Sequence, residues 1–318
     1  MLVAGVVAGV ALLVLPDLAG LDRFTPFAQV VSFRPYTLAG LAPVVLLLSW
    51  LAVRRWRTLR PLAALLVTVV VVGAALVLPR AVPVVGAQGV STADGRTLTV
   101  VAFNTLSGNA DIEAVADLVR TERPDLVSLV EAGRSYRSRL APLVEPLGYR
   151  LHTSVGPDGG DLSGVTALVA GSLGAVDVTD YPHTPFPSVE LSGGNLGSLR
   201  FVAFHSLAPR RGDVPQWHSD VAGVARWCAG PGPAIVAGDF NATFDHSVFR
   251  SATAGCSDAA AQRGQGLAPT WPTWLPDWIG PQIDHVLATD PITAEAFSLR
   301  EVPGSDHRAV IARLRVPG

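Results

Sequence analysis

The chain has 318 residues, more than one domain usually contains, so two structural units are expected. Its hydrophobic share of 49% is unevenly distributed, and from residue 81 onward 17 arginines, no lysine and 24 acidic residues give a net charge of −7. Nonspecific nucleic-acid binding depends on cationic contacts to phosphates, so this acidic part argues against a general nuclease without excluding one. Local positive patches remain open at Arg210-Arg211 and around Arg134, Arg137 and Arg139.

Uncharged segments at the start of the chain predict membrane-spanning helices. Residues 35–53 and 61–79 hold no charged side chain, and at about 1.5 Å per residue each would be roughly 28 Å long, close to the hydrocarbon thickness of a bilayer. Residues 1–16 are also uncharged but shorter, and they lack the basic residues that open a signal peptide. We interpret them as a third span, with an export signal as the alternative. Residues 1–80 are therefore expected to form a bundle of about three transmembrane helices.

The distribution of arginine predicts how this bundle is oriented. Four arginines (54, 55, 57 and 60) lie in the short connection between the second and third spans, against only Arg23 and Arg34 in the first connection. Basic short loops stay in the cytoplasm. The third span then runs outward, so we expect a multi-pass protein of the cell membrane whose domain after about Arg80 lies outside the cytoplasm.

A linker and an α/β domain are expected after the last span. Residues 81–96 are rich in proline and glycine and predict the linker. In residues 97–318, helical spacing of apolar residues predicts helices over 111–123, with Asp111 as N-cap, and over 214–227. Apolar runs predict strands at 100–103, 126–130, 165–170, 188–191, 199–204, 234–237, 283–288 and 309–316. Many short strands with few helices favour a layered, mixed sheet.

The two cysteines, Cys228 and Cys256, leave two interpretations open. In an oxidising compartment an even pair is compatible with a disulfide. Two small, buried, unlinked side chains explain the pair equally well.

Five short polar motifs stand at the ends of apolar runs: Asn104, Glu131, Gly238-Asp239-Phe240-Asn241, Ile283-Asp284-His285 and Ser305-Asp306-His307. In an α/β protein, polar groups at strand ends are the usual location of a functional site. Each motif taken singly is an ordinary turn or cap. Their joint occurrence is what indicates a site.

The residue types suit cleavage of a phosphoester, which needs a polarised phosphorus, an activated water and stabilised charge on the leaving oxygen. Glu131 and Asp306 are hard oxygen ligands for Mg²⁺ or Mn²⁺, and Asn104 would complete that shell or hold a carboxylate. Asp239 would orient or deprotonate the attacking water, and Asn241 would hydrogen-bond a phosphate oxygen.

The order Asn, Glu, His, Gly-Asp-x-Asn, Asp-His, Ser-Asp-His resembles the endonuclease/exonuclease/phosphatase superfamily over residues 97–316. The resemblance implies a four-layer αββα sandwich of two mixed sheets with the site at one edge. It also implies that His307 contacts the scissile phosphate while paired with Asp284, and that His205 is a second phosphate contact. His285 is expected to point to the opposite face of its strand, because adjacent strand residues alternate sides.

Three spans followed by this domain resemble membrane-anchored actinobacterial members of the superfamily associated with teicoplanin- and vancomycin-type resistance. The resemblance implies a prenyl-pyrophosphate lipid of the envelope as substrate. The first hypothesis is thus a metal-dependent phosphoester or pyrophosphate hydrolase, anchored in the lipid bilayer and acting outside the cytoplasmic membrane. One alternative is an extracellular endonuclease, exonuclease or nucleotide phosphodiesterase, which the acidic charge disfavours. A further alternative is an inactive module that binds a phosphorylated ligand.

The segment 270–278 places three tryptophans just before Asp284. Tryptophan prefers membrane interfaces and apolar ligand surfaces, which indicates a lipid-facing rim. A loop packed onto the edge of the sheet is the equally plain interpretation.

Overall fold

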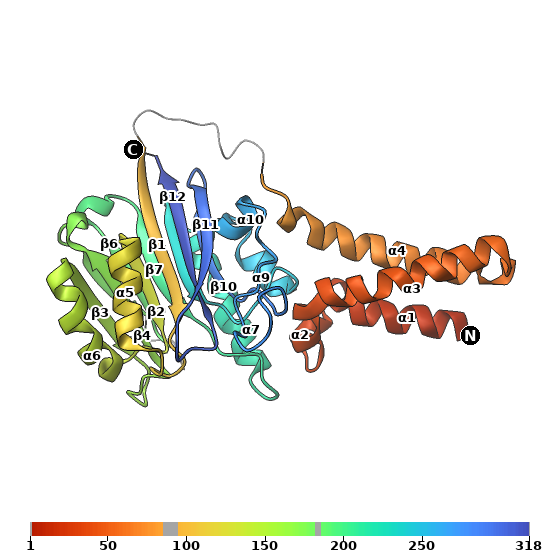
Figure 1. Cartoon of the computed structure of the whole chain (residues 1–318), viewed down its shortest axis with the longest axis horizontal. Coiled ribbons are helices and arrows are strands. Elements are labelled where there is room, and N and C mark those ends of the chain that lie inside the picture. Colours follow the sequence, from red (N-terminus) through yellow and green to blue (C-terminus); the bar gives the residue numbers. More distant parts are fainter. Residues whose placement is uncertain (1, 85–94, 182–185, 318) are drawn as a thin grey trace.

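The computed structural model describes residues 2–84, 95–181 and 186–317. Figure 1 shows two units, a helical bundle at the N-terminus and a sandwich of two sheets, with the bundle extending from the side of the sandwich that carries α7, α9 and α10. Residues 85–94 of the predicted linker 81–96 lie outside the described residues.

The bundle consists of three apolar helices and one short one: α1 (Leu2–Val14), α2 (Phe27–Val30), α3 (Arg34–Arg54) and α4 (Arg60–Val77). A small core of Val14, Leu38, Val69 and Val77 holds α1, α3 and α4 together. At Gly73 a Cβ atom would lie only 2.8 Å from Leu38 Cδ2, so a residue without a side chain permits this close approach.

Two stretches, Phe27–Arg54 and Arg57–Ala81, are long and apolar enough to cross a membrane by length and composition. They contain the predicted spans 35–53 and 61–79. Helix α1 has 13 residues, which at about 1.5 Å per residue reaches roughly 20 Å and falls short of the hydrocarbon thickness. The third span therefore stays a prediction.

The domain contains two six-stranded mixed sheets. The first has the strand order β11-β12-β1-β2-β4-β3 and the second β5-β6-β7-β8-β10-β9. Strands β1 and β2 pair in parallel, as do β7 and β8, and the remaining neighbours are antiparallel. The strands are β1 (Arg96–Asn104), β2 (Leu126–Val130), β3 (Tyr149–Val155), β4 (Gly164–Ala170), β5 (Asp177–Tyr181), β6 (Ser188–Ser192), β7 (Arg200–His205), β8 (Ala234–Asp239), β9 (Cys256–Asp258), β10 (Asp284–Thr289), β11 (Thr293–Glu301) and β12 (Arg308–Val316).

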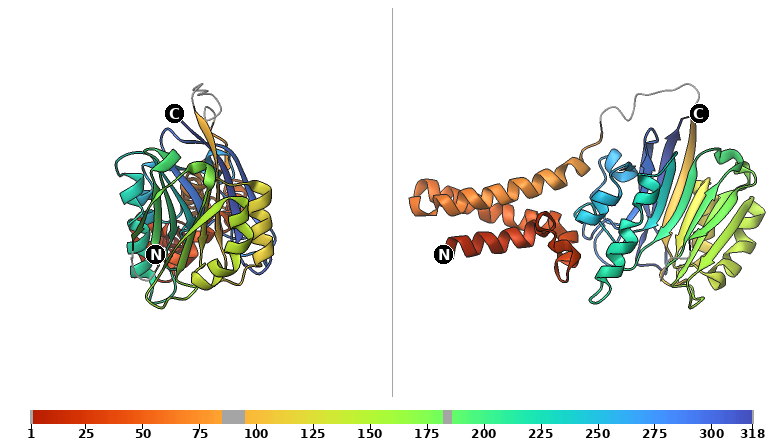
Figure 2. Two further views of the ribbon diagram at one scale, coloured as in Figure 1. Left: turned by 90° about the vertical axis from the view of Figure 1, so that its left-hand side faces the viewer. Right: turned by 180° about the vertical axis from the view of Figure 1, so that it is seen from behind.

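Side-chain alternation along the strands builds the layers. In β1, Val100 and Ala102 face the second sheet in the central core, whereas Val101 and Phe103 face the helices outside. Helices α5 (Ile112–Glu122) and α6 (Arg134–Val144) cover the first sheet, and α7 (Val214–Ala222), α8 (Ala225–Cys228) and α9 (Ser247–Ala252) cover the second. The end-on view in Figure 2 shows these outer helices with the two sheets between them. The predicted two-sheet sandwich is confirmed.

Local sequence decides where the helices begin and end. Helix α5 starts as predicted, because the Asp111 side chain accepts a hydrogen bond of 2.8 Å from Ala114 N. The prediction of one continuous helix over 214–227 is wrong, because the helix is interrupted at Gly223 and divides into α7 and α8. Glycine is a poor helix former, and the bonds from Val224 N to Val221 O and from Trp227 N to Val224 O tighten the turn there.

A network of buried ion pairs joins the bundle to the domain. Arg34, at the start of α3, pairs with Asp17 and also with Asp245 at 2.9 Å. Arg80 contacts the same Asp245 at 2.9 Å, and Arg250 contacts Asp17 at 2.5 Å. The side chains of Arg34 and Asp17 are fully shielded from solvent.

The first part of the predicted linker belongs to this joint. Pro83 pairs with Arg263, and Val84 N donates to Gln262 O at 3.1 Å, next to the short helix α10 (Ala259–Gln262). Backbone contacts therefore join residues 83 and 84 of the predicted linker to the domain.

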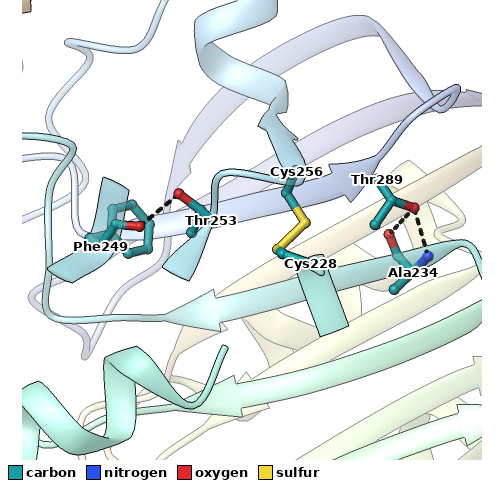
Figure 3. Close-up of a disulfide and its surroundings, with 6 residues drawn as sticks. All are labelled: Cys228, Ala234, Phe249, Thr253, Cys256 and Thr289. Atoms are coloured by element: carbon teal, nitrogen blue, oxygen red, sulfur yellow. Dashed lines mark hydrogen bonds between the residues drawn. A yellow bond between two sulfur atoms is a disulfide. The ribbon is translucent and has the colours of Figure 1, made fainter. Parts of the chain in front are cut away.

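Cys228 and Cys256 form a disulfide between the end of α8 and the start of β9 (Figure 3). The bridge fastens an outer helix to the edge strand of the second sheet. This resolves the alternative that composition left open.

Candidate active site

The predicted site residues meet at one edge of the two sheets because the strands that carry them begin or end there. His205 and Asp284 lie on either side of Asp239 in the register of the second sheet. Asn104 ends β1 in the first sheet, and Glu131 directly follows β2. All eight predicted residues join one contact network: Asn104, Glu131, His205, Asp239, Asn241, Asp284, Asp306 and His307.

Asn104 bridges the two sheets. Its Nδ2 donates to Glu131 Oε1 at 3.0 Å and to Asp239 Oδ2 at 2.9 Å, while its Oδ1 accepts from Leu106 N at 2.8 Å. The side chain is 1% exposed. This geometry holds the two carboxylates in place, one of the two roles predicted for Asn104.

Glu131 is fixed by a strained backbone and by a turn. Its φ of +55° lies in the left-handed region, which residues other than glycine rarely adopt and which is common at functional sites. Its Oε2 accepts from Ser107 N at 2.7 Å and from Ser107 Oγ at 3.0 Å. The carboxylate is thereby aimed at the edge of the sheets.

His307 and Asp284 form a buried pair. Nδ1 of His307 lies 2.9 Å from Asp284 Oδ2, which leaves Nε2 directed at Asp239 Oδ2 and Asp306 Oδ1, both 3.9 Å away. Burial by itself lowers the pKa of His307, but the charge and hydrogen bond of Asp284 and the charges of Asp239 and Asp306 outweigh burial and raise it to about 10. His307 is therefore an imidazolium at neutral pH, with a free donor at the centre of the site.

Asp239 is the last residue of β8 and follows a strand position that only glycine can occupy. A Cβ at Gly238, whose φ is +149°, would lie 1.9 Å from Phe204 O. Asn241 follows with φ of +46°; its N donates to Asp239 Oδ1 at 2.8 Å and its Nδ2 donates to Asp239 Oδ2 at 3.2 Å. Burial and the nearby charge of Asp284 raise the pKa of Asp239, which makes its carboxylate a better proton acceptor.

His205 closes the site on the second sheet. Its Nε2 lies 3.9 Å from Glu131 Oε1 and 3.8 Å from Asp239 Oδ2, and its ring stacks on Phe186 at 4.2 Å. Burial lowers the pKa of His205 to about 4 despite the opposing charge of Glu131. The ring is therefore neutral at pH 7, and its protonation differs from that of His307.

The oxygen groups at the site fit a hard divalent cation. Asp306 Oδ1 is buried and has no hydrogen-bond partner among the described residues, and Glu131 presents a second carboxylate. Mg²⁺ and Mn²⁺ prefer such ligands. Asp239, Asp284 and His307 also cluster with ligand atoms within 4.8 Å of one another. In that cluster Nδ1 of His307 is already paired with Asp284, so we take Glu131 and Asp306 as the candidate ligands.

Sequence reasoning missed three residues that hold the site together. Ser107 binds Glu131, Trp271 Nε1 donates to Asp306 Oδ2 at 2.9 Å, and Ser305 Oγ donates to Asn104 O at 2.7 Å. Only Trp271 and Ser305 carried a sequence signal, since both lie in or beside motifs that were singled out. His285 behaves as expected, with its ring away from the site against Asp258 Oδ2 at 3.0 Å.

This sandwich, with an Asp-His pair and carboxylates at one edge, defines a phosphoesterase-type fold. The Endonuclease/Exonuclease/phosphatase family matches residues 101–307, and the chain belongs to that family. No curated protein matches the sequence.

Solved structures share the fold at low sequence identity. The endonuclease/exonuclease/phosphatase from Bacteroides vulgatus has a TM-score of 0.55 and 16% identity, over 70% of this chain and 99% of that one. The family protein from Beutenbergia cavernae has 0.54 and 20%, over 70% and 72%. The mannosyl-6-phosphatase of Bacteroides thetaiotaomicron has 0.53 and 15%, over 68% and 99%. At these identities the likeness establishes the fold alone.

Proposed function

We propose that the chain is a membrane-anchored, metal-dependent phosphoester or pyrophosphate hydrolase that acts outside the cytoplasmic membrane on a prenyl-pyrophosphate lipid of the envelope. The observation that carries the hydrolase is the Asp284–His307 pair, which presents a charged donor between Asp239 and Asp306. An inactive binding module would not need this complete arrangement.

The residues divide the chemistry of hydrolysis among them. His307 Nε2 donates to an oxygen of the scissile phosphate and offsets its charge, while Asp284 keeps the ring protonated and oriented. Asp239 accepts a proton from the attacking water, whose oxygen forms the new P–O bond as the bond to the leaving oxygen breaks. Asn241 and His205 lie beside Asp239 and would orient the phosphate. A divalent cation at Glu131 and Asp306 would supply positive charge for the phosphoryl oxygens.

Three observations support a membrane anchor with an external domain. The bundle has two helices of spanning length, and the arginine-rich turn between α3 and α4 lies at the end of the bundle away from the domain (Figure 1). The arginines on the domain side, Arg23, Arg34 and Arg80, are fewer than the four at positions 54, 55, 57 and 60, and this asymmetry favours the far turn in the cytoplasm. The disulfide fits an oxidising compartment.

Two assays of the purified full-length protein in detergent test the function: release of phosphate from a prenyl-pyrophosphate lipid and cleavage of DNA strands. The substrates are undecaprenyl pyrophosphate and double-stranded DNA in parallel, with Mg²⁺, with Mn²⁺ and with EDTA. We expect release from the lipid that requires metal and His307, with His307→Ala inactive. His218→Ala serves as the matched control, because His218 lies on α7 outside the site network.

The two alternatives have distinct outcomes. Cleavage of DNA without release of phosphate from the lipid assigns the protein to the nucleases. The membrane helices would then only hold the domain at the membrane. Equal turnover by the wild type and His307→Ala contradicts catalysis at this site. Binding of the lipid without release of phosphate would favour the inactive module.

A further inference from the structure

Two of the most exposed large hydrophobic side chains of the domain lie in one short segment. Trp274 is 66% exposed and Trp278 is 67% exposed. Both belong to the segment 271–278, whose single charged residue is Asp277. Exposed tryptophans so close together indicate a surface that is covered by something apolar.

One end of the segment is attached to the active site. Trp271 Nε1 donates to Asp306 Oδ2 at 2.9 Å, and Thr273 N donates to Asp306 O at 2.9 Å. The rings of Trp271 and Trp274 pack edge to face, with centroids 5.5 Å apart. Trp274 therefore packs against Trp271, and Trp271 in turn contacts the site residue Asp306.

The other end is attached to the first turn of α3. The hydroxyl of Tyr36 lies 2.9 Å from Trp278 O, from Gly280 O and from Gly280 N. Tyr36 is the third residue of α3, which is 21 residues long and so about 30 Å in length. Where α3 crosses the bilayer, its first turn lies at the membrane surface, and Trp278 lies at the same level.

Other exposed apolar side chains lie in the connection between α1 and α3, at the same end of α3 as Trp278. Leu18 is 60% exposed, Phe24 is 52% exposed with the guanidinium of Arg23 over its ring, and Phe33 is 37% exposed. Tryptophan and other aromatic residues concentrate where hydrocarbon meets headgroups. The exposed tryptophans thus lie beside the first turn of α3, where the surface that the bundle would present to lipid begins.

We propose that the segment 271–278 docks on the outer surface of the bilayer and seats the active-site edge there, so that the site takes a phosphate group whose carrier chain stays in the membrane. This inference rests on the proposed function: the reaction is the proposed hydrolysis, and the docking needs the proposed membrane anchor with an external domain. The occupant is the lipid surface itself. Docking depends on aromatic side chains rather than on basic ones, so it should change little with salt concentration.

Lipid contact is measured directly by labelling. Both cysteines of the chain are bridged, so Pro276→Cys introduces a single reactive thiol between the two exposed tryptophans. A nitroxide attached there, in full-length protein reconstituted in phosphatidylcholine vesicles, should be accessible to oxygen dissolved in the lipid and shielded from a water-soluble nickel relaxant. Leu147→Cys, next to α6 on the side of the domain away from the bundle, should give the opposite result. A water-accessible label at position 276 would overturn the docking.

Kinetics test the consequence for the substrate. The double variant Trp274→Ser/Trp278→Ser should raise KM by about tenfold for a long-chain prenyl pyrophosphate in vesicles, with kcat unchanged. For a short, water-soluble prenyl pyrophosphate with the same headgroup, both constants should stay at wild-type values. Trp56→Ser removes a tryptophan that is 56% exposed in the turn between α3 and α4, and should change neither.

The two proposals fail in different ways. Hydrolysis of both substrates with an unchanged KM in the double variant overturns the membrane dock but keeps the hydrolase. A lipid-accessible label with no hydrolysis of either substrate keeps the dock but overturns the proposed function.

Discussion

Arg34 and Asp245, which are 211 positions apart in sequence, form a buried ion pair of 2.9 Å that links the first residue of α3 to the loop before α9. Asp245 also accepts two hydrogen bonds from Arg80, which lies just after α4, the last helix of the bundle. A single carboxylate thus connects the segments before and after the two long helices to the catalytic domain.

Removing one partner should destabilise this joint. Asp245→Asn leaves Arg80 without its buried counterion and removes one of the two counterions of Arg34, the other being Asp17. Such a loss costs about 3–5 kcal/mol. We expect a clear fall in the thermal unfolding midpoint of the full-length protein in detergent. Asp117→Asn disrupts an exposed ion pair with Arg120 and should have little effect. Equal midpoints for the two variants would contradict a role of the joint in stability.

The joint should also weaken in acid through His246. Thr243 N donates to His246 Nδ1 at 3.0 Å, which places the ring proton on Nε2, 2.7 Å from Ala28 O. Burial lowers the pKa of His246 below its ordinary value of 6.5 in the folded protein, despite opposing contributions that include the Ala28 carbonyl. The unfolded chain therefore binds more protons below pH 6.5, and folding stability falls as pH decreases from there.

In His246→Gln, whose amide can still donate to Ala28, the loss of stability between neutral and acid pH should be smaller. The measurement is the unfolding midpoint of both proteins across that pH range. Parallel curves would show that His246 makes no contribution, because histidines elsewhere affect both proteins alike.

Asp284→Asn should reduce activity strongly while keeping the shape of the site. The amide can hydrogen-bond His307 but no longer stabilises its positive charge, so kcat/KM should fall by about a hundredfold or more. Phosphate release at saturating metal is the measurement, and His285→Gln, on the opposite face of the same strand, is the control for local packing. Wild-type activity in Asp284→Asn would remove the pair from the mechanism.

Metal binding should depend on Glu131 and Asp306. A ligand present at about 100 times its Kd stabilises the folded state by roughly 2.7 kcal/mol, so Mn²⁺ should raise the unfolding midpoint of the wild type. We expect this increase to disappear in Glu131→Gln and Asp306→Asn and to persist in Asp284→Asn. The reverse pattern would place the cation at the cluster of Asp239, Asp284 and His307 instead.

The disulfide provides a test of compartment. Its ends are 28 residues apart, and closing a loop of that size stabilises a protein by about 2–4 kcal/mol. Protein purified from membranes and unfolded without reductant should contain no titratable thiol, and the double variant Cys228→Ser/Cys256→Ser should unfold at a lower temperature. Two free thiols in the native material would argue for a domain in the cytoplasm.

The sequence alone predicted eight of the twelve strands among the described residues, and it predicted the polar residues that the structure brings together at one edge of the sheets. Apolar runs that end in Asn104, Glu131 and Asp239 predicted strands that deliver polar groups to one edge, because a strand buried on both faces leaves only its ends for chemistry. Uncharged stretches predicted the two long helices, because the thickness of a bilayer fixes how many apolar residues a spanning helix needs. Local rules failed within elements, as at Gly223, where a weak helix former broke a continuous apolar pattern.

Only the tertiary structure decided which residues of different elements contact one another. Ser107 donates a hydrogen bond to Glu131, and Trp271 donates one to Asp306. Both donors lie in loops, where no helical or strand periodicity in the sequence predicts which residues meet. The contacts of Arg34 with Asp245 and of Tyr36 with Trp278 join residues more than 200 positions apart. Such contacts arise when hydrophobic packing brings distant segments together, and burial then requires each charge and each polar group to find a partner.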